Sequence, residues 1–331
     1  MKIRVIGSGS WSTALSQVLV DNGHDVLIYG ISKDEVDDIN INHRNSKFFG
    51  DVNIAANLKA TDDIDRVKDA DIILLAVPVK ALEGVLNELY DLLDHSVTII
   101  SVAKGFHPET KRRLSLEVKD LMRDKVSHVV SLIGPSHAEE VIVRKLTLVN
   151  SVCEDEEAAV VIQKLFANDY FRVYTNTDVI GAEIAAALKN VMAIASGALN
   201  GLGQGDNARA ALMTRGLAEI TRFGIAMGGK LDTFLGLNGV GDLIVTCSSL
   251  HSRNYQAGLQ IGKADDASAF LKENTKTTEG ILTTKTVYEL SLELGIDMPI
   301  TSEVYKVLYE GKKPSIAIGD LMQRPLKAED R

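Results

Sequence analysis

Cysteine and proline are scarce in this sequence, whose 331 residues include two cysteines and six prolines. Cys153 and Cys247 are too far apart for a C-x-x-C pair or a zinc-ligand spacing, which excludes a disulfide scaffold and a cysteine-based metal or redox motif. We interpret both as small buried apolar side chains, kept as thiols in a reducing compartment. The seven histidines show no metal-ligand spacing either, so no metal site is expected.

An excess of positive charge is also missing, and so are long apolar runs. The net formal charge of −9 argues against a general nucleic-acid binder, which needs basic patches to meet phosphates. An anionic ligand must therefore be met by cations placed locally. The strongest unbroken apolar run, residues 72–79, is too short to cross a bilayer. Met1-Lys2 lead directly into a short apolar strand, without the pattern of a signal peptide. We expect a cytoplasmic protein that neither binds nucleic acid nor inserts into a membrane.

The two halves of the chain follow different patterns. Up to residue 176, short apolar runs rich in β-branched residues alternate with helical stretches: IRVIG, DVLIYG, DIILLAVP, VTIISVAKG, HVVSLIGPS, LTLV and FRVYTN. Runs that are apolar throughout suit strands buried on both faces of a parallel sheet. Beyond residue 180 the apolar period is near 3.6. The sequence therefore predicts an α/β protein, with a doubly wound, mostly parallel Rossmann-like sheet domain over residues 1–179 and an all-helical domain over residues 180–331.

A glycine turn follows the first predicted strand, in VIGSGSWSTAL at residues 5–15. Gly7 permits a tight turn, and Gly9 lets the backbone approach a pyrophosphate at the N-terminus of the next helix. Ser12 occupies the position of the third glycine, whose role is close packing of helix on strand, so the phosphate cradle should survive. A purely structural turn is the alternative, but the surrounding βαβ pattern favours a dinucleotide site.

The residues after the second predicted strand leave the choice of dinucleotide open. An acidic residue at that strand end typically holds the ribose of NAD, whereas an arginine favours NADP. Here the stretch reads LIYGIS, with no carboxylate before Asp34 and only Lys33 as a nearby cation. The sequence does not decide between NAD and NADP.

Two segments place polar residues at the carboxyl ends of predicted strands, where α/β sheets bind ligands. Lys104 lies in SVAKG, at the end of a predicted strand, where it could contact a ligand. The alternative is a lysine whose amine simply extends into solvent. Gly134 and Ser136, in IGPSH, could offer a backbone amide and a hydroxyl to a ligand, although composition fits a plain turn equally well.

Lys189 lies in a helical stretch of small residues, EIAAALKNVMAIA. At the edge of the apolar stripe it would be an ordinary solvated lysine. Partly desolvated, its pKa would fall toward neutrality, and the amine could act as a general acid or base.

Asp242 follows a glycine loop, and Ser252, Arg253 and Asn254 open a further helical stretch. A helix N-terminus with these residue types suits an anion, because backbone amides and the guanidinium can both bind phosphate. An ordinary N-cap with a solvated arginine is the alternative.

Together these stretches resemble the NAD(P)-dependent glycerol-3-phosphate dehydrogenases of the bacterial type, over about residues 3–325. The segments that carry the resemblance occur in the same order: GSGSWSTAL, SVAKG, GPSHAEEV, FRVYTN, ALKNVMAIASG, NARAALMTRGLAEI, GVGDLIVTC, HSRN and MPIT. The resemblance implies interconversion of sn-glycerol 3-phosphate and dihydroxyacetone phosphate with NAD or NADP, supplying glycerophospholipid synthesis. It also implies a homodimer.

The resemblance assigns roles to individual positions. Lys189 matches the proton acceptor, and Lys104 would touch both cofactor and substrate and add positive charge at the reacting oxygen. Substrate contacts are implied for Lys104, Gly134, Ser136, Lys189, Asp242, Ser252, Arg253 and Asn254. Besides Gly7 and Gly9, cofactor contacts are implied for Ser10, Trp11, Lys104, Ala138, Arg253, Thr277 and Glu279.

Three departures from the family pattern concern the surroundings of the cofactor and of Lys189. Ser12 replaces the third glycine, Ile31-Ser32 replace a pair that is usually basic or histidine, and Ala185-Ala186 replace a glycine pair. The last change is expected to narrow the space beside the lysine. Thr277 stands where the family usually has an aliphatic residue.

Two other functions fit the same two-domain plan. One is a ketopantoate reductase-like or 3-hydroxyacid dehydrogenase-like enzyme, whose substrate carries a carboxylate. The other is a regulator that senses NAD(H) without turnover, which the altered glycine turn would allow. The retention of Lys104, Lys189 and Asp242 argues against the regulator.

Overall fold

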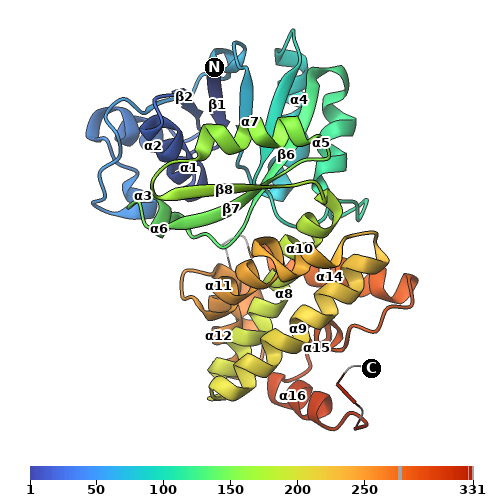
Figure 1. Ribbon diagram of the computed structural model, residues 1–331. Helices are drawn as coiled ribbons and strands as arrows, with labels where there is room; N and C mark the ends of the chain where they lie inside the picture. The colour runs from blue at the N-terminus through green and yellow to red at the C-terminus, as the bar shows by residue number, and fades with distance from the viewer. Residues whose placement is uncertain (275–277, 327, 330–331) are drawn as a thin grey trace.

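The computed structural model describes residues 1–274, 278–326 and 328–329. The first half forms a sheet flanked by helices, and the second half forms a group of helices below it in Figure 1. Helix α8 (Val179–Gly201) leads from one part into the other. The predicted α/β fold with a helical C-terminal part is confirmed.

The sheet has eight strands in the order β3-β2-β1-β4-β5-β6-β7-β8. All neighbouring strands are parallel except β6 and β7. The strands are β1 (Lys2–Ile6), β2 (Asp25–Tyr29), β3 (Lys59–Thr61), β4 (Ile72–Leu75), β5 (Val97–Ser101), β6 (Val126–Ile133), β7 (Thr147–Val152) and β8 (Phe171–Asn176). The strand order reverses between β1 and β4, and in such sheets this switch point is where ligands bind.

Helices cover both faces of the sheet, as a doubly wound fold requires. They are α1 (Ser10–Asp21), α2 (Lys33–Asp37), α3 (Ser46–Phe49), α4 (Val79–Leu92), α5 (Leu114–Met122), α6 (Ala138–Val141) and α7 (Glu156–Phe166), with short helical turns at 38–42, 64–67 and 123–125. One apolar core joins α1, α6 and α7 to the sheet, and a second joins α4 and α5 to the opposite face. The all-apolar strand runs are explained by this burial on both sides.

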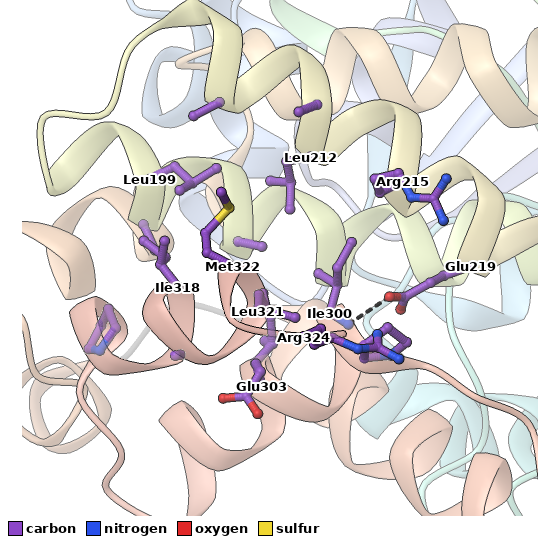
Figure 2. A pocket seen from close by; sticks show the side chains of 18 of the residues that line it. Leu199, Leu212, Arg215, Glu219, Ile300, Glu303, Ile318, Leu321, Met322 and Arg324 are labelled. Atoms are coloured by element: carbon purple, nitrogen blue, oxygen red, sulfur yellow. Dashed lines mark hydrogen bonds between the residues drawn. The ribbon is translucent and has the colours of Figure 1, made fainter. Parts of the chain in front are cut away.

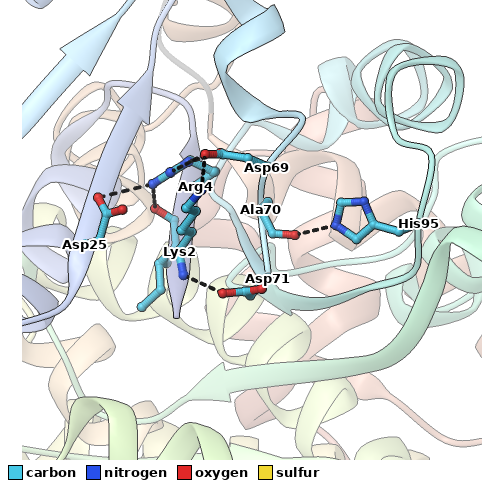
Figure 3. A network of polar contacts seen from close by, with 8 residues as sticks. Lys2, Arg4, Asp25, Asp69, Ala70, Asp71 and His95 are labelled. Carbon is cyan, nitrogen blue, oxygen red and sulfur yellow. Dashed lines mark hydrogen bonds and ion pairs between the residues drawn. The ribbon is translucent and has the colours of Figure 1, made fainter.

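A charged network fastens the amino ends of the central strands (Figure 3). The Arg4 guanidinium pairs with Asp69 at 2.8 Å and with Asp25 at 3.4 Å, and it lowers the pKa of the Asp69 carboxyl. The Lys2 backbone amide donates to Asp71 at 2.7 Å, and the His95 ring contacts the Ala70 carbonyl at 2.8 Å. Because these contacts lie at the amino ends of parallel strands, they leave the carboxyl ends to ligands.

The second half is helical and packs around α8. Its other helices are α9 (Asp206–Ala226), α10 (Leu231–Leu235), α11 (Asp242–Ser248), α12 (Arg253–Ala264), α13 (Ser268–Glu273), α14 (Glu279–Glu293), α15 (Pro299–Tyr309) and α16 (Pro314–Met322), with a helical turn at 237–241. Within the described residues, α8 alone is long and apolar enough to cross a membrane, but it is mostly buried in the fold. It is therefore the core helix of this half.

Side chains from both halves interlock at the junction. Glu183 of α8 pairs with Arg113 at 2.7 Å and accepts hydrogen bonds from the backbone amide and hydroxyl of Ser115. Phe106, from the loop after β5, is buried in the apolar core of the helical half. The two halves thus share a packed interface, which fixes the loop that carries Lys104.

Candidate active site

The glycine turn after β1 has the geometry of a phosphate cradle. Gly7 has φ +109°, and a Cβ there would lie 2.8 Å from the Ala76 carbonyl oxygen. A Cβ on Gly9 would meet nothing closer than the Ser12 hydroxyl at 3.9 Å, and α1 begins at Ser10 without a side-chain cap. The uncapped helix N-terminus leaves backbone amides for an anion, so these residues fit the pyrophosphate of a dinucleotide.

Ser12, at the third glycine position, is accommodated within α1. Its side chain is buried, and its hydroxyl donates to the Gly9 carbonyl at 2.8 Å. The added polar group is therefore satisfied inside the helix.

Lys189 is buried, not solvated. Its side chain is 4% exposed and forms an ion pair with Asp242, which is completely buried at the start of α11. Burial lowers the pKa of the Lys189 amine to about 8; Asp242 opposes this shift, and the positive charge of Lys104 adds to it. An amine in this state can release and accept protons near neutral pH.

Close contact between α8 and α12 brings the predicted anion-binding residues to the lysine helix. A Cβ on Gly197 of α8 would lie 2.1 Å from the Tyr255 carbonyl oxygen, and one on Gly258 of α12 would lie 2.0 Å from the Ile194 carbonyl oxygen. The two backbones therefore touch, which only glycine allows. Helix α12 begins at Arg253, and the Ser252 hydroxyl caps it by accepting from the Tyr255 amide at 3.2 Å.

Helix α14 adds further groups to the same place. Its first residue, Glu279, is half-buried, and burial raises the pKa of its carboxyl, while Lys104, Arg253 and Lys189 lower it. The Asn254 side-chain oxygen accepts a hydrogen bond from the Gly280 backbone amide at 2.9 Å, and this bond orients the Asn254 side chain. Charged side chains from α8, α12 and the loop after β5 are therefore close enough to Glu279 of α14 to affect the pKa of its carboxyl.

The loop after β6 is shaped by a glycine that packing requires. Gly134 has φ +157°, and a Cβ there would lie 2.8 Å from the Val149 Cα of β7. The Ser136 hydroxyl donates to the Gly134 carbonyl at 2.9 Å. Ala138 is buried against the core at the start of α6, which packs beside α1. This loop therefore leads to α6 beside α1, the helix that follows the glycine turn. Thr277 lies outside the described residues.

Two residues that sequence reasoning missed, Asn190 and His137, are among those that carry a buried polar atom without a hydrogen-bond partner in the described part of the chain. These atoms are the Asn190 amide nitrogen and the His137 Nε2 atom, and one oxygen of Asp242, which the sequence did predict, is also without a partner. Asn190 follows Lys189 directly in sequence, and burial lowers the pKa of His137, on which Lys189 also acts. Because orphaned buried polar atoms are costly, this arrangement suits a polar substrate. The adjacency of Asn190 to Lys189 and of His137 to Ser136 is the sequence signal that could have found them.

An apolar cavity lies elsewhere, among α8, α9, α15 and α16 (Figure 2). It has a volume of about 630 Å³, and Leu199, Leu212 and Ile318 are among the apolar residues that line it. Its Glu219 carboxylate accepts from the Ile300 amide at 2.6 Å and so caps α15. No cluster of three metal-ligating side chains occurs in the described part of the chain. The geometry thus points to Lys189, not to this cavity, for chemistry.

Comparison with known families agrees with the motifs and the geometry. Residues 2–159 match the N-terminal part, and residues 178–319 the C-terminal part, of the NAD-dependent glycerol-3-phosphate dehydrogenase family. A glycerol-3-phosphate dehydrogenase (NAD(P)+) of Lactococcus lactis is 48% identical over 331 residues, covering 99% of this chain and 97% of the relative. One of Streptococcus mutans is 47% identical, with coverages of 99% and 98%.

Solved structures support the same assignment. The glycerol-3-phosphate dehydrogenase of Coxiella burnetii superposes with a TM-score of 0.91 at 33% identity, covering 98% of this chain and 99% of that one. A ketopantoate reductase of Ralstonia eutropha, with a TM-score of 0.60 at 15% identity over 98% and 100% of the chains, shares the fold alone. The chain belongs to the NAD-dependent glycerol-3-phosphate dehydrogenase family.

Proposed function

We propose that this protein interconverts sn-glycerol 3-phosphate and dihydroxyacetone phosphate with NAD or NADP, and that in the cell it supplies glycerol 3-phosphate for glycerophospholipid synthesis. Residues 1–179 hold most of the cofactor, and residues 180–331 contribute the lysine and most of the substrate contacts. We further propose that the protein is cytoplasmic and forms a homodimer. Light scattering on the purified protein tests the dimer, because it measures the molecular mass in solution.

The observation that carries this proposal is the buried Lys189 amine, paired with Asp242 beside Lys104. When bound, the nicotinamide supplies or accepts the hydride. In the reducing direction the Lys189 ammonium donates a proton to the oxygen of the substrate ketone, and in the oxidising direction the neutral amine takes the hydroxyl proton. Lys104 adds positive charge where the alkoxide develops. Asp242 holds the lysine in place.

In this proposal, the N-terminus of α12 binds the phosphate group of the substrate. Arg253 supplies a guanidinium at the helix N-terminus, and Asn254 and Ser252 supply polar contacts beside it. Gly134 and Ser136 face the substrate from the sheet half. Binding energy gained at the phosphate then orients the reacting carbon toward Lys189. The cofactor lies along the glycine turn, with contacts from Ser10, Trp11, Ala138 and Glu279.

A substrate panel tests this function. Purified protein is mixed with NADH or NADPH and one of three candidates: dihydroxyacetone phosphate, dihydroxyacetone or ketopantoate. Loss of the nicotinamide absorbance is followed. Turnover with dihydroxyacetone phosphate alone is expected, because Arg253 requires the phosphate. Activity confined to the carboxylate substrate would favour the reductase alternative, and nucleotide binding without any turnover would favour a regulator.

A further inference from the structure

We propose that this protein selects NADH over NADPH, and that Glu35 together with the cation-free end of β2 makes the selection. The inference rests on the proposed function, since it concerns the cofactor of that reaction. It addresses the choice that the sequence left open.

The end of β2 touches the glycine turn. Gly30 follows β2 directly, and a Cβ there would lie 2.5 Å from the hydroxyl oxygen of Ser8, the residue between Gly7 and Gly9. With a pyrophosphate over the turn, the ribose of the adenosine would lie at this junction, where residues after β2 distinguish a 2′-hydroxyl from a 2′-phosphate in Rossmann folds.

A carboxylate is fastened at this junction. Glu35 is 8% exposed, and the Ser8 hydroxyl donates to one of its oxygens. The other oxygen pairs with the Lys47 amine at 2.6 Å. The Glu35 carboxylate therefore lies beside the glycine turn, held there by a residue of the turn itself and by Lys47. A carboxylate accepts a hydrogen bond from a ribose hydroxyl, but it repels a phosphate, which at neutral pH only accepts.

The cations that a 2′-phosphate needs are missing or already paired. Ile31, the residue after Gly30, is 90% exposed and offers no charge. The Lys33 amine lies 3.1 Å from an Asp37 carboxylate oxygen. A hollow of about 620 Å³ beside this segment is lined by Asp34, Glu35, Asp37 and Asp38, and Lys47 is the one lysine or arginine among its lining residues. A 2′-phosphate of about −1.5 to −2 charge would enter a negative field here.

Direct binding tests the proposal without turnover. Trp11 is the single tryptophan of the chain and the second residue of α1, so quenching of its fluorescence reports binding at the glycine turn. We expect NADH to bind on the order of 100-fold more tightly than NADPH, since like charges brought together cost several kcal/mol. Calorimetry with ADP-ribose and its 2′-phosphorylated form isolates the adenosine end from the nicotinamide.

Two variants assign the cause. Ile31→Arg places a guanidinium at the end of β2 on an exposed position, and we expect it to tighten NADPH binding at least about tenfold, with NADH binding changed less than threefold. Glu35→Gln keeps an acceptor for Ser8 and removes the charge, and it should also favour NADPH. Leu326→Arg is the control: it adds the same charge at a fully exposed position after α16. It should change neither the affinity for NADH nor the affinity for NADPH.

The binding results distinguish failure of the proposed NADH preference from failure of the proposed dehydrogenase function. Equal affinities, or tighter binding of NADPH by the unmodified protein, would overturn this inference and leave the dehydrogenase assignment standing. A preference for NADH that both Ile31→Arg and Glu35→Gln leave unchanged would also overturn it, because other residues would then make the choice. Failure to bind either nucleotide would instead contradict the proposed function.

Discussion

The cofactor half and the substrate half of the site are built in different ways. In the sheet half, backbone conformation makes the site: Gly7 and Gly134 adopt positive φ values, and each glycine lies against a neighbouring strand or loop. In the helical half, side chains make the site, and contact between α8 and α12 brings them together. Local sequence therefore encodes the first half, whereas long-range packing assembles the second. If so, removal of the Lys189 amine from the helical half should abolish chemistry and leave nucleotide binding intact.

The largest expected effect belongs to Lys189. Lys189→Ala should lower kcat for dihydroxyacetone phosphate reduction by about 10²-fold or more, because a positioned proton donor contributes at least that much. NADH binding, measured by Trp11 fluorescence, should change little. Near-normal turnover would remove Lys189 from the chemistry.

Stability provides a control for that variant. Removing the amine leaves Asp242 buried and unpaired, which destabilises a fold by about 3–5 kcal/mol. The double variant Lys189→Met/Asp242→Asn should recover much of that loss in urea unfolding, since neither charge remains, and still lack activity. Recovery of activity along with stability would show that the single variant had failed only by misfolding.

Arg253 should mainly affect the affinity for the substrate. Hydrogen bonds to charged groups are worth about 1.5–3 kcal/mol, so Arg253→Ala should raise the KM for dihydroxyacetone phosphate by about 10- to 100-fold. Lys263→Ala, an exposed change in the last turn of the same helix, serves as the matched control. An unchanged KM in Arg253→Ala would place the phosphate elsewhere.

The contact between α8 and α12 can be tested by adding one methyl group. In Gly258→Ala the new Cβ would meet the Ile194 carbonyl oxygen, so the helices must separate, and we expect a loss of about 1–3 kcal/mol in the free energy of unfolding. Gly319→Ala is the matched control, because a Cβ in α16 meets nothing within 4 Å. It should stabilise by about 0.5–1 kcal/mol. Equal effects in both variants would contradict the close contact.

The sheet half was predictable because its signals are local. The glycine turn and the seven longer strands were all predicted from neighbouring residues. β3 was missed because three residues are too few to show a period. Glu35 was missed because the acid was sought at the strand end, whereas it reaches Ser8 from within α2.

The helical half was less predictable. Lys189, Asp242 and Arg253 could be named from resemblance and from their residue types. The pairing of Lys189 with Asp242 joins two helices distant in sequence, and no local pattern encodes it. The burial of Lys189 was left open beforehand for the same reason, since a lysine in a small-residue helix fits solvent and interior alike.

The pH dependence of kcat/KM in both directions tests the role of the Lys189 amine directly. In the proposed mechanism, reduction needs the protonated Lys189 amine, whose pKa is about 8. Its kcat/KM should be level below about pH 7, fall by about half at pH 8 and then fall about tenfold per pH unit. The kcat/KM of oxidation, which needs the neutral amine, should rise about tenfold per pH unit up to about pH 7 and become level above about pH 9. A reduction rate that stays level up to pH 10, as an ordinary lysine with a pKa of 10.5 would give, would contradict it.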